Sequence, residues 1–163
     1  METLSIRLAT AGDARKLVAL LMPVFCAGET YTIDRDIPEE DAVAYWTAPD
    51  KTVFVAEDAG QVLGSYYIRP NQQGGGAHVC NCGFVTGAQA QGRGVARAML
   101  DHALQQARAQ GYRAMQFNFV VATNTRAIAI WQGAGFEVVG RLPGAFNHPN
   151  EGYVDALVMY RAL

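Results

Sequence analysis

Residues 91–96 read QGRGVA and stand where an expected strand at 78–86 has ended and the strongest expected helix in the chain begins. That helix covers 92–110 and ends at Gly111, and its apolar side chains recur every four positions, at Val95, Met99, Ala103 and Ala107. The glycines let backbone N–H groups approach a ligand closely, and the start of a helix favours negative charge. The segment therefore predicts a phosphate or pyrophosphate site, with a plain tight turn as the alternative.

Two other phosphate-binding motifs do not match this segment. No Lys-Ser or Lys-Thr pair follows the glycines, so the lysine and the metal-holding hydroxyl of a P-loop are missing. The sequence also contains no GxGxxG, and the preceding strand is not the first of the chain. Both facts argue against a dinucleotide-binding Rossmann site.

The remaining elements are predicted from hydrophobic periodicity, turn residues and a capping-box pattern in which Thr10 stands three residues before Asp13. In chain order they are a strand at 4–9, a helix from Thr10 to about Phe25, a short helix after Pro38, a hairpin of strands at 52–57 and 61–68, a loop at 69–77, a strand at 114–121, a helix capped by Asn124 or Thr123 toward Gly135, and strands at 136–142 and 153–160. This order predicts an α/β fold. We expect a mixed, mostly antiparallel sheet of about seven strands, with helices on both faces and a central βαβ unit.

Composition limits the class of protein further. The 163 residues suit a single domain, 1–163, and half of them are hydrophobic. The net charge of −2 provides no overall attraction for nucleic acid or an anionic membrane. Three cysteines are too few for a disulfide framework, and no apolar run approaches the ~20 residues of a membrane span. We therefore expect a cytoplasmic protein without nucleic-acid or membrane partners.

Two motifs together resemble the GNAT N-acetyltransferase superfamily. Residues 91–96 match its (Gln/Arg)xxGx(Gly/Ala) coenzyme A loop. The family's later helix-and-turn signature is matched by Asn124, Ala127, Trp131, Gly135 and Phe136. The expected order of elements is also similar to that fold, from Leu4 to Tyr160.

The resemblance implies that the chain binds acetyl-CoA as its acetyl donor. The pyrophosphate would lie on the N–H groups of the loop, and the pantetheine arm would follow the strand that ends near residues 84–86. A backbone N–H of that strand would stabilise the oxyanion. The implied cofactor-binding residues are Phe84, Val85, Thr86, Gln91, Gly92, Arg93, Gly94, Val95, Ala96, Arg97, Asn124 and Trp131. For Asn124 a plain helix cap is the alternative.

The proton-transfer groups are left open by the sequence. Trp131 stands where many family members have a tyrosine that protonates the thiolate, and an indole cannot replace a phenol as an acid. Either Tyr160, Tyr153 or a water supplies the proton, or the thiolate leaves without an acid, because a thiol is already a tolerable leaving group. His78 is the candidate base because imidazole is a common proton acceptor in enzymes, with Asp155 or loss of the proton to solvent as alternatives.

No metal is expected in this site. His78, Cys80 and Cys82 would share one strand face, but they would span roughly 13 Å, too far to meet one ion. We expect the two cysteines to be small buried hydrophobic residues.

Candidate acceptor-binding residues come from three places. Asn81 and Asn118 lie on the two strands expected to separate, so they are candidates to contact the acceptor at the reacting centre, with pairing to backbone across the cleft as the alternative. Glu29 and Tyr31 lie between the first two helices, where the family often builds the acceptor wall. In the closing part of the chain, Asp155 is a candidate, and residues 141–152 are expected to form either an acceptor-side loop or only a long turn.

The segments HVCNCGF and FNFVVATN additionally resemble yeast azetidine-2-carboxylate acetyltransferases, which implies a small amino or imino acid as acceptor. The predicted function is acetyl transfer to the amine of a small molecule. Peptide or protein N-termini are the alternative acceptors, and a non-catalytic acyl-CoA sensor is the rival from another class. A homodimer joined through the final strands is an open expectation.

Overall fold

The computed structural model describes residues 4–163. Its strands are β1 (Ser5–Leu8), β2 (Thr52–Asp58), β3 (Gln61–Pro70), β4 (Val79–Thr86), β5 (Ala114–Val121), β6 (Glu137–His148) and β7 (Gly152–Ala162). Its helices are α1 (Ala14–Ala27), α2 (Glu39–Trp46), α3 (Val95–Ala109) and α4 (Thr125–Gly133). Short 3₁₀ turns occur at η1 (Ala11–Asp13), η2 (Gly74–Gly76) and η3 (Ala88–Ala90). None of the helices in this described part is long and apolar enough to cross a membrane.

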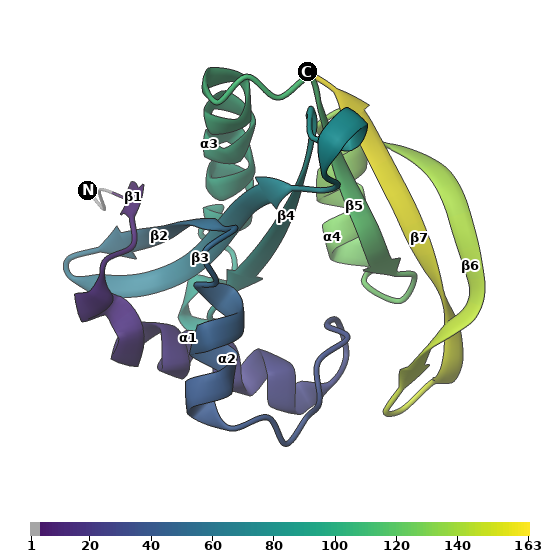
Figure 1. Ribbon diagram of the computed structural model, residues 1–163. Coiled ribbons are helices and arrows are strands. Elements are labelled where there is room, and N and C mark those ends of the chain that lie inside the picture. The colour runs from purple at the N-terminus through teal and green to yellow at the C-terminus, as the bar shows by residue number, and fades with distance from the viewer. Residues whose placement is uncertain (1–3) are drawn as a thin grey trace.

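The strands form one sheet of seven in the order β1-β2-β3-β4-β5-β7-β6 (Figure 1). Neighbouring strands are antiparallel except β4 and β5, which are parallel and are joined through α3. The predicted fold class, a mostly antiparallel sheet with a central βαβ unit, is confirmed.

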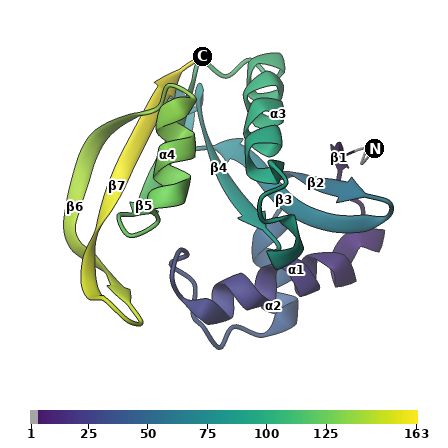
Figure 2. The same ribbon diagram turned by 180° about the vertical axis from the view of Figure 1, so that it is seen from behind.

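Helices cover both faces of the sheet (Figure 2). Successive side chains of a strand point to opposite faces, and β2 shows this alternation clearly. Val53 and Val55 pack with α1 and α2 around Phe25 and Trp46. Phe54 and Ala56 belong to the larger core, which includes the buried face of α3 and Trp131 of α4.

The start of α1 follows the predicted capping box. The Thr10 N–H donates to Asp13 Oδ2 at 2.8 Å, and the box leads through η1 into the helix. Asp13 is buried and accepts two hydrogen bonds from the Arg7 guanidinium, each 2.9 Å long. These bonds from Arg7 hold the pKa of Asp13 well below its usual range.

Two expected boundaries near β3 and α3 are wrong. The segment 69–77 is only partly a loop, because β3 continues to Pro70 and the three glycines form η2. The helix expected from 92 starts at Val95, since Gly92 and Gly94 have positive φ angles of 74° and 71° that a right-handed helix does not contain.

The segment 141–152 is mostly strand and not a loop or long turn. β6 and β7 extend the expected strands into a long hairpin that turns after His148. The register between the strands shifts from Leu142 to Phe146, which marks a bulge around Pro143. Asp155 stabilises this bulge by accepting the Gly144 N–H at 2.9 Å. β6 is an edge strand, where a proline is tolerated.

Candidate active site

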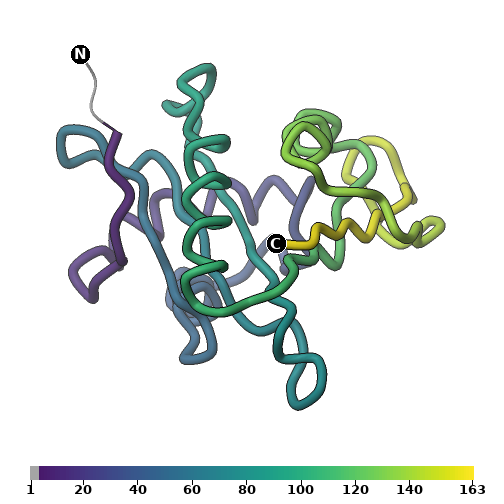
Figure 3. Tube along the Cα trace, turned by 90° about the horizontal axis from the view of Figure 1, so that it is seen from above, coloured from purple at the N-terminus to yellow at the C-terminus, as the bar shows by residue number. Residues whose placement is uncertain are grey.

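The parallel strands β4 and β5 pair briefly and then separate. Within residues 4–163 their ladder consists of two pairs, Val79 with Ala114 and Cys80 with Met115. The two strands meet at one end and diverge toward the other, with α4 behind the opening (Figures 1 and 2). Seen from above, β5, β6, β7 and α4 lie to one side of the opening and the remaining strands lie to the other (Figure 3).

Asn81 lies where the ladder ends. Its Nδ2 donates to the Gln116 carbonyl oxygen on β5 at 2.9 Å, and its Oδ1 accepts from Arg69 Nε at 3.2 Å. The side chain thus continues the link between the strands for one more residue. This is the backbone pairing that the sequence left open as the alternative to acceptor binding.

Backbone groups of β4 face the opening at every second residue. The His78 carbonyl accepts Arg113 N–H on the β5 side, whereas the Val79 carbonyl accepts Asn71 N–H on the β3 side. At the other end of β4, the Gly87 N–H donates to Leu63 of β3. Because peptide groups alternate along a strand, the N–H and C=O groups of Cys82, Phe84 and Thr86 face the opening, and those of Val85 face β3.

The glycine loop lies between η3 and α3, at the open end of β4. A Cβ at Gly92 or Gly94 would meet no atom within 4 Å, so the loop surface there is open. The Gln91 and Arg93 N–H groups are bonded inside the loop, to Ala88 and Ala90.

The free amides belong to the helix start. The first bond of α3 runs from the Ala98 N–H to the Gly94 carbonyl. The N–H groups of Val95, Ala96 and Arg97 therefore have no partner within the helix and suit an anion.

The two arginines near this loop have different surroundings. Arg93 Nη2 lies 2.8 Å from Asp58 Oδ2, so its guanidinium is tied to the β2–β3 hairpin. Arg97 is exposed and makes no ion pair with any residue from 4 to 163. Arg97 is thus the better placed of the two to neutralise a bound phosphate.

α4 fills the back of the opening with Trp131. The indole is 9% exposed and packs against Phe84 of β4 and Phe117 of β5, with ring centroids 5.1 and 4.9 Å away. The indole therefore fills the space between the diverging strands. Asn124 is the N-cap residue of α4, but its side chain makes no capping hydrogen bond, which leaves the amide available to a ligand.

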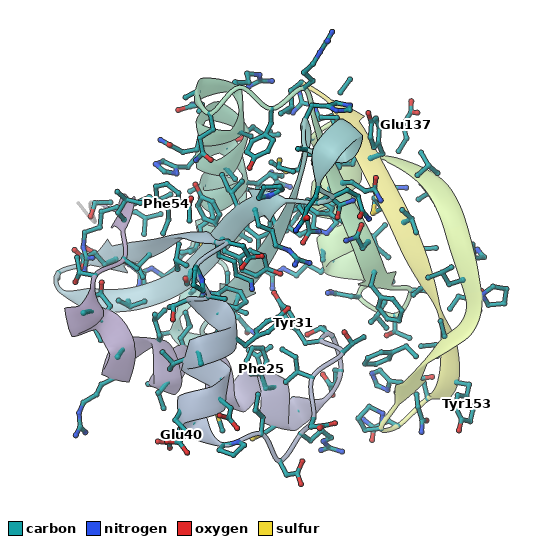
Figure 4. All side chains as sticks on the ribbon, viewed as in Figure 1. Phe25, Tyr31, Glu40, Phe54, Glu137 and Tyr153 are labelled. Carbon is teal, nitrogen blue, oxygen red and sulfur yellow. The ribbon has the colours of Figure 1, made fainter. Side chains whose placement is uncertain are left out.

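Tyr31 connects the segment after α1 to β4. Its hydroxyl donates to the Phe84 carbonyl oxygen at 2.8 Å, and its ring contacts Phe25 and Trp46 edge-on. In Figure 4 it lies below the point where β4 and β5 diverge, above Phe25. Burial raises the pKa of Tyr31 well above its ordinary value, so the hydroxyl is a donor and not a base.

A cavity of about 450 Å³ opens beside Tyr31. One wall comes from the segment after α1 and the other from the end of β6. The residues that line it are Gly28, Tyr31, Thr32, Ile33, Asp34, Arg35, Ala145, Phe146, Asn147, His148 and Pro149. Tyr31 and part of the segment 141–152 are thus brought together in one cavity. Arg35 had no distinguishing sequence signal, because it lies in an irregular segment without a motif.

Four other expected site residues are placed elsewhere. His78 was expected on the strand, but it lies exposed in the turn before β4, at the closed end of the opening. Tyr160 pairs with Gln116 of β5, on the face opposite Phe117 and Trp131, so it does not replace the family's tyrosine. Glu29 is exposed outside the cavity lining. Asn118 is exposed on β5 and bonds Asn71 Oδ1 at 2.7 Å.

Asp155 is committed to the β6 bulge. Besides the Gly144 N–H it accepts Arg141 Nη1 at 2.7 Å, and the two contacts lower the pKa of its carboxyl. A carboxylate held in this way is a weak base. Cys80 and Cys82 are buried, as expected, and the described residues contain no group of three or more His, Cys, Asp or Glu side chains able to hold a metal ion.

The diverging parallel strands and the glycine loop at a helix start form the arrangement that the sequence resemblance implied. The family model described as acetyltransferase (GNAT) family matches residues 18–136, which is more than half of the chain. The chain belongs to the GNAT acetyltransferase family. It is therefore an enzyme of the N-acetyltransferase class, and the fold and the family predicted from its motifs are both confirmed.

Known relatives agree with this assignment. The enzyme is similar to the N-acetyltransferase aca1 of Schizosaccharomyces pombe, with 29% identity over 80% of this chain and 71% of the relative. A GCN5-related N-acetyltransferase from Kribbella flavida is 43% identical over 98% of both chains, with a TM-score of 0.92. A phosphinothricin acetyltransferase from Sinorhizobium meliloti, solved in complex with acetyl-CoA, shares the fold at 21% identity, 99% and 89% coverage and a TM-score of 0.86.

Proposed function

We propose that this protein transfers the acetyl group of acetyl-CoA to the amine of a small molecule, with an amino or imino acid as the expected acceptor. The observation that carries the proposal is the juxtaposition of the open β4 edge, the glycine loop and the cavity beside Tyr31. A 450 Å³ cavity is of the size that holds a small ligand. The resemblance to azetidine-2-carboxylate acetyltransferases supports the same acceptor class and stays a prediction.

The loop and α3 hold the anionic end of the donor. N–H groups of Val95, Ala96 and Arg97 point out of the helix start, where the helix dipole favours phosphate. The Arg97 guanidinium supplies a positive charge. The Asn124 amide, free of a capping role, is the candidate partner for the pantetheine arm.

The edge of β4 orients the reacting group. When bound, acetyl-CoA supplies a thioester whose carbon–sulfur bond breaks as the acceptor nitrogen forms a carbon–nitrogen bond, while the nitrogen loses one proton and the thiolate gains one. The Phe84 N–H faces the opening and is the candidate oxyanion donor. Trp131 and Phe117 exclude water from the back of the site.

Proton transfer is assigned to solvent. His78 lies at the closed end of the opening, Asp155 is held in an ion pair, and Trp131 has no acidic hydroxyl. A thiol near pKa 8.5 is a tolerable leaving group without a strong acid. The amine proton leaves through water that enters by the cavity.

The edge strand β6 carries an exposed apolar surface. Val138, Val139 and Leu142 are exposed apolar residues on the edge strand β6, and such an edge can pair with a second copy. We propose a homodimer joined through this hairpin, in a reducing, cytoplasmic setting that fits the three free cysteines. The whole chain 1–163 would act as one domain.

The deciding experiment measures free thiol released from acetyl-CoA with amino acids, imino acids, aminoglycosides, polyamines and peptide N-termini, and coenzyme A binding in parallel. Turnover with a small amine is expected. Turnover with peptides alone would replace the proposed acceptor class. Tight coenzyme A binding without any turnover would favour an acyl-CoA sensor.

A further inference from the structure

The cavity beside Tyr31 contains an arginine whose orientation is fixed by the protein. Arg35 Nε donates to the Cys26 carbonyl oxygen at the end of α1, at 2.7 Å. Its methylenes lie directly over Gly28. A Cβ built at that glycine would stand only 2.6 Å from Arg35 Cδ. Gly28 ends α1 with a φ of 67°, so the glycine serves both the turn and the arginine. The guanidinium is therefore held against the cavity wall.

No carboxylate among residues 4–163 forms an ion pair with this guanidinium. Asp34, which also lines the cavity, and Asp36 flank Arg35 in sequence without pairing with it in that range. Arg35 lines the cavity and uses one of its five N–H donors on Cys26, and among residues 4–163 its outer nitrogens make no hydrogen bond to a protein acceptor. A guanidinium in this state favours a planar anion with two oxygens.

The opposite wall adds a second donor from the end of β6. His148 Nδ1 accepts the N–H groups of Asn150 and Glu151, at 3.1 and 3.2 Å. Because Nδ1 is an acceptor, the proton of the neutral ring is on Nε2. His148 and Arg35 both line the cavity, so the Nε2–H donor belongs to the same cavity as the guanidinium.

The cavity connects to the reacting centre through Tyr31. The Tyr31 ring forms part of the lining, and its hydroxyl is bonded to Phe84 on the β4 edge. Tyr31 thus contacts both the cavity that Arg35 and His148 line and the β4 edge.

We propose that Arg35, assisted by His148, binds a carboxylate of the acceptor, which makes this enzyme selective for amines that carry a free carboxylate. The inference rests on the proposed acetyl transfer and names its acceptor chemistry. Arg35 is a specificity-determining residue that contacts the acceptor away from the reacting nitrogen. Removing it raises the KM for carboxylate acceptors and leaves the affinity for coenzyme A unchanged.

The test compares each acid with its own carboxamide, using alanine and alaninamide, proline and prolinamide, and azetidine-2-carboxylate and its amide. We expect kcat/KM for the best acid to exceed that of its amide at least fivefold. The fivefold ratio is a demanding criterion. The amine of the amide is less basic than that of the acid, so a larger fraction of it is in the reactive neutral form. A smaller ratio overturns the inference.

Variants assign the preference to the two residues. Arg35→Met keeps the aliphatic stem over Gly28 and removes the charge, so it should lower kcat/KM for the acid at least tenfold and leave the amide unchanged. Arg15→Met on the exposed face of α1 is the matched control for charge and should change neither. His148→Asn keeps an acceptor for the turn and removes the Nε2 donor, so it should reduce the acid preference by a smaller factor.

The outcomes separate the two proposals. Turnover of amides but not acids, or an Arg35→Met enzyme that keeps the acid preference, overturns the carboxylate site and leaves the acetyltransferase activity standing. Failure of every acid, amide and unrelated amine to release thiol overturns the proposed function and the inference with it. If Arg35→Met does not fold, the acid-to-amide ratios of kcat/KM for the wild type and for His148→Asn still test the carboxylate site.

Discussion

The phenol of Tyr31 donates a 2.8 Å hydrogen bond to the backbone carbonyl oxygen of Phe84. The bond joins the segment after α1, which lines the proposed acceptor cavity, to the β4 edge, which is expected to orient the thioester. It occupies the carbonyl of Phe84 and leaves the N–H of the same residue directed at the opening. One hydroxyl therefore fixes the distance between the two halves of the proposed site.

Tyr31→Phe should lower both stability and activity. The Phe84 carbonyl would lose its partner, which costs about 1–2 kcal/mol in the free energy of unfolding. A loosened β4 edge should also reduce kcat more than it raises the KM for acetyl-CoA. Denaturant unfolding and steady-state kinetics measure the two effects. Tyr153→Phe is the control, because that side chain is 77% exposed at the far hairpin. Equal behaviour of the two variants would contradict the coupling.

Gly94→Glu should abolish tight coenzyme A binding. The glycine has a φ of 71° and open space where a Cβ would stand, so the variant adds some backbone strain and a negative charge at the expected phosphate site. Gly111→Glu is a matched control at the other end of α3, with a φ of 88° and the same open surroundings. Calorimetric titration with coenzyme A should show at least a tenfold loss for the first variant alone. A similar loss in both would mean that strain, and not charge, weakens binding.

Trp131→Phe should reduce stability without removing an acid. The indole packs between Phe84 and Phe117. The smaller phenyl ring leaves part of that space empty, which lowers the free energy of unfolding by about 1–3 kcal/mol. Because indole does not titrate, the alkaline limb of the pH–rate profile should not move. Thermal unfolding and kcat between pH 6 and 10 test this. A shifted alkaline limb would show that the position takes part in proton transfer.

The Arg7–Asp13 pair should make stability depend on acid pH. The pKa of Asp13 is lower in the folded protein than in the unfolded chain, chiefly because Arg7 donates to it. Its contribution is therefore complete above the ordinary aspartate value of about 4 and is lost as the pH falls below it. Asp13→Asn should cost about 1–3 kcal/mol at pH 7, and the difference from the wild type should shrink toward pH 3. Urea unfolding at both pH values measures it, and a constant difference would contradict the assignment.

The sequence predicted the fold because its signals are local. The capping box at Thr10, the period of α3 and the turn at Asp58-Ala59-Gly60 each act over a few residues, and all three are present in the structure. The end of β6 was not predicted, because its structure depends on a contact with another strand. Pro143 and Gly144 are typical of a turn, yet they form a bulge whose geometry is held by Asp155 of the next strand.

The parts of the candidate site that depend on local backbone conformation could be predicted from the sequence. The parts that depend on side-chain contacts between distant segments could not. The glycine loop is marked by Gly92 and Gly94, whose positive φ angles few other residues adopt. Asn81 looked like a ligand group until the structure paired it with Gln116 and Arg69. His78 was placed on a strand, but it precedes β4 by one residue and lies in a turn.

The order of elements, the glycine loop and the family were therefore all contained in the sequence, because periodicity, caps and glycine conformation are encoded within short segments. The cavity beside Tyr31 was not. It joins the segment after α1 to the end of β6, and its link to β4 is a bond between residues 53 positions apart. Contacts at such separation form only when the whole sheet and both helical layers are packed, so Arg35 and His148 acquire a shared role from the tertiary structure alone.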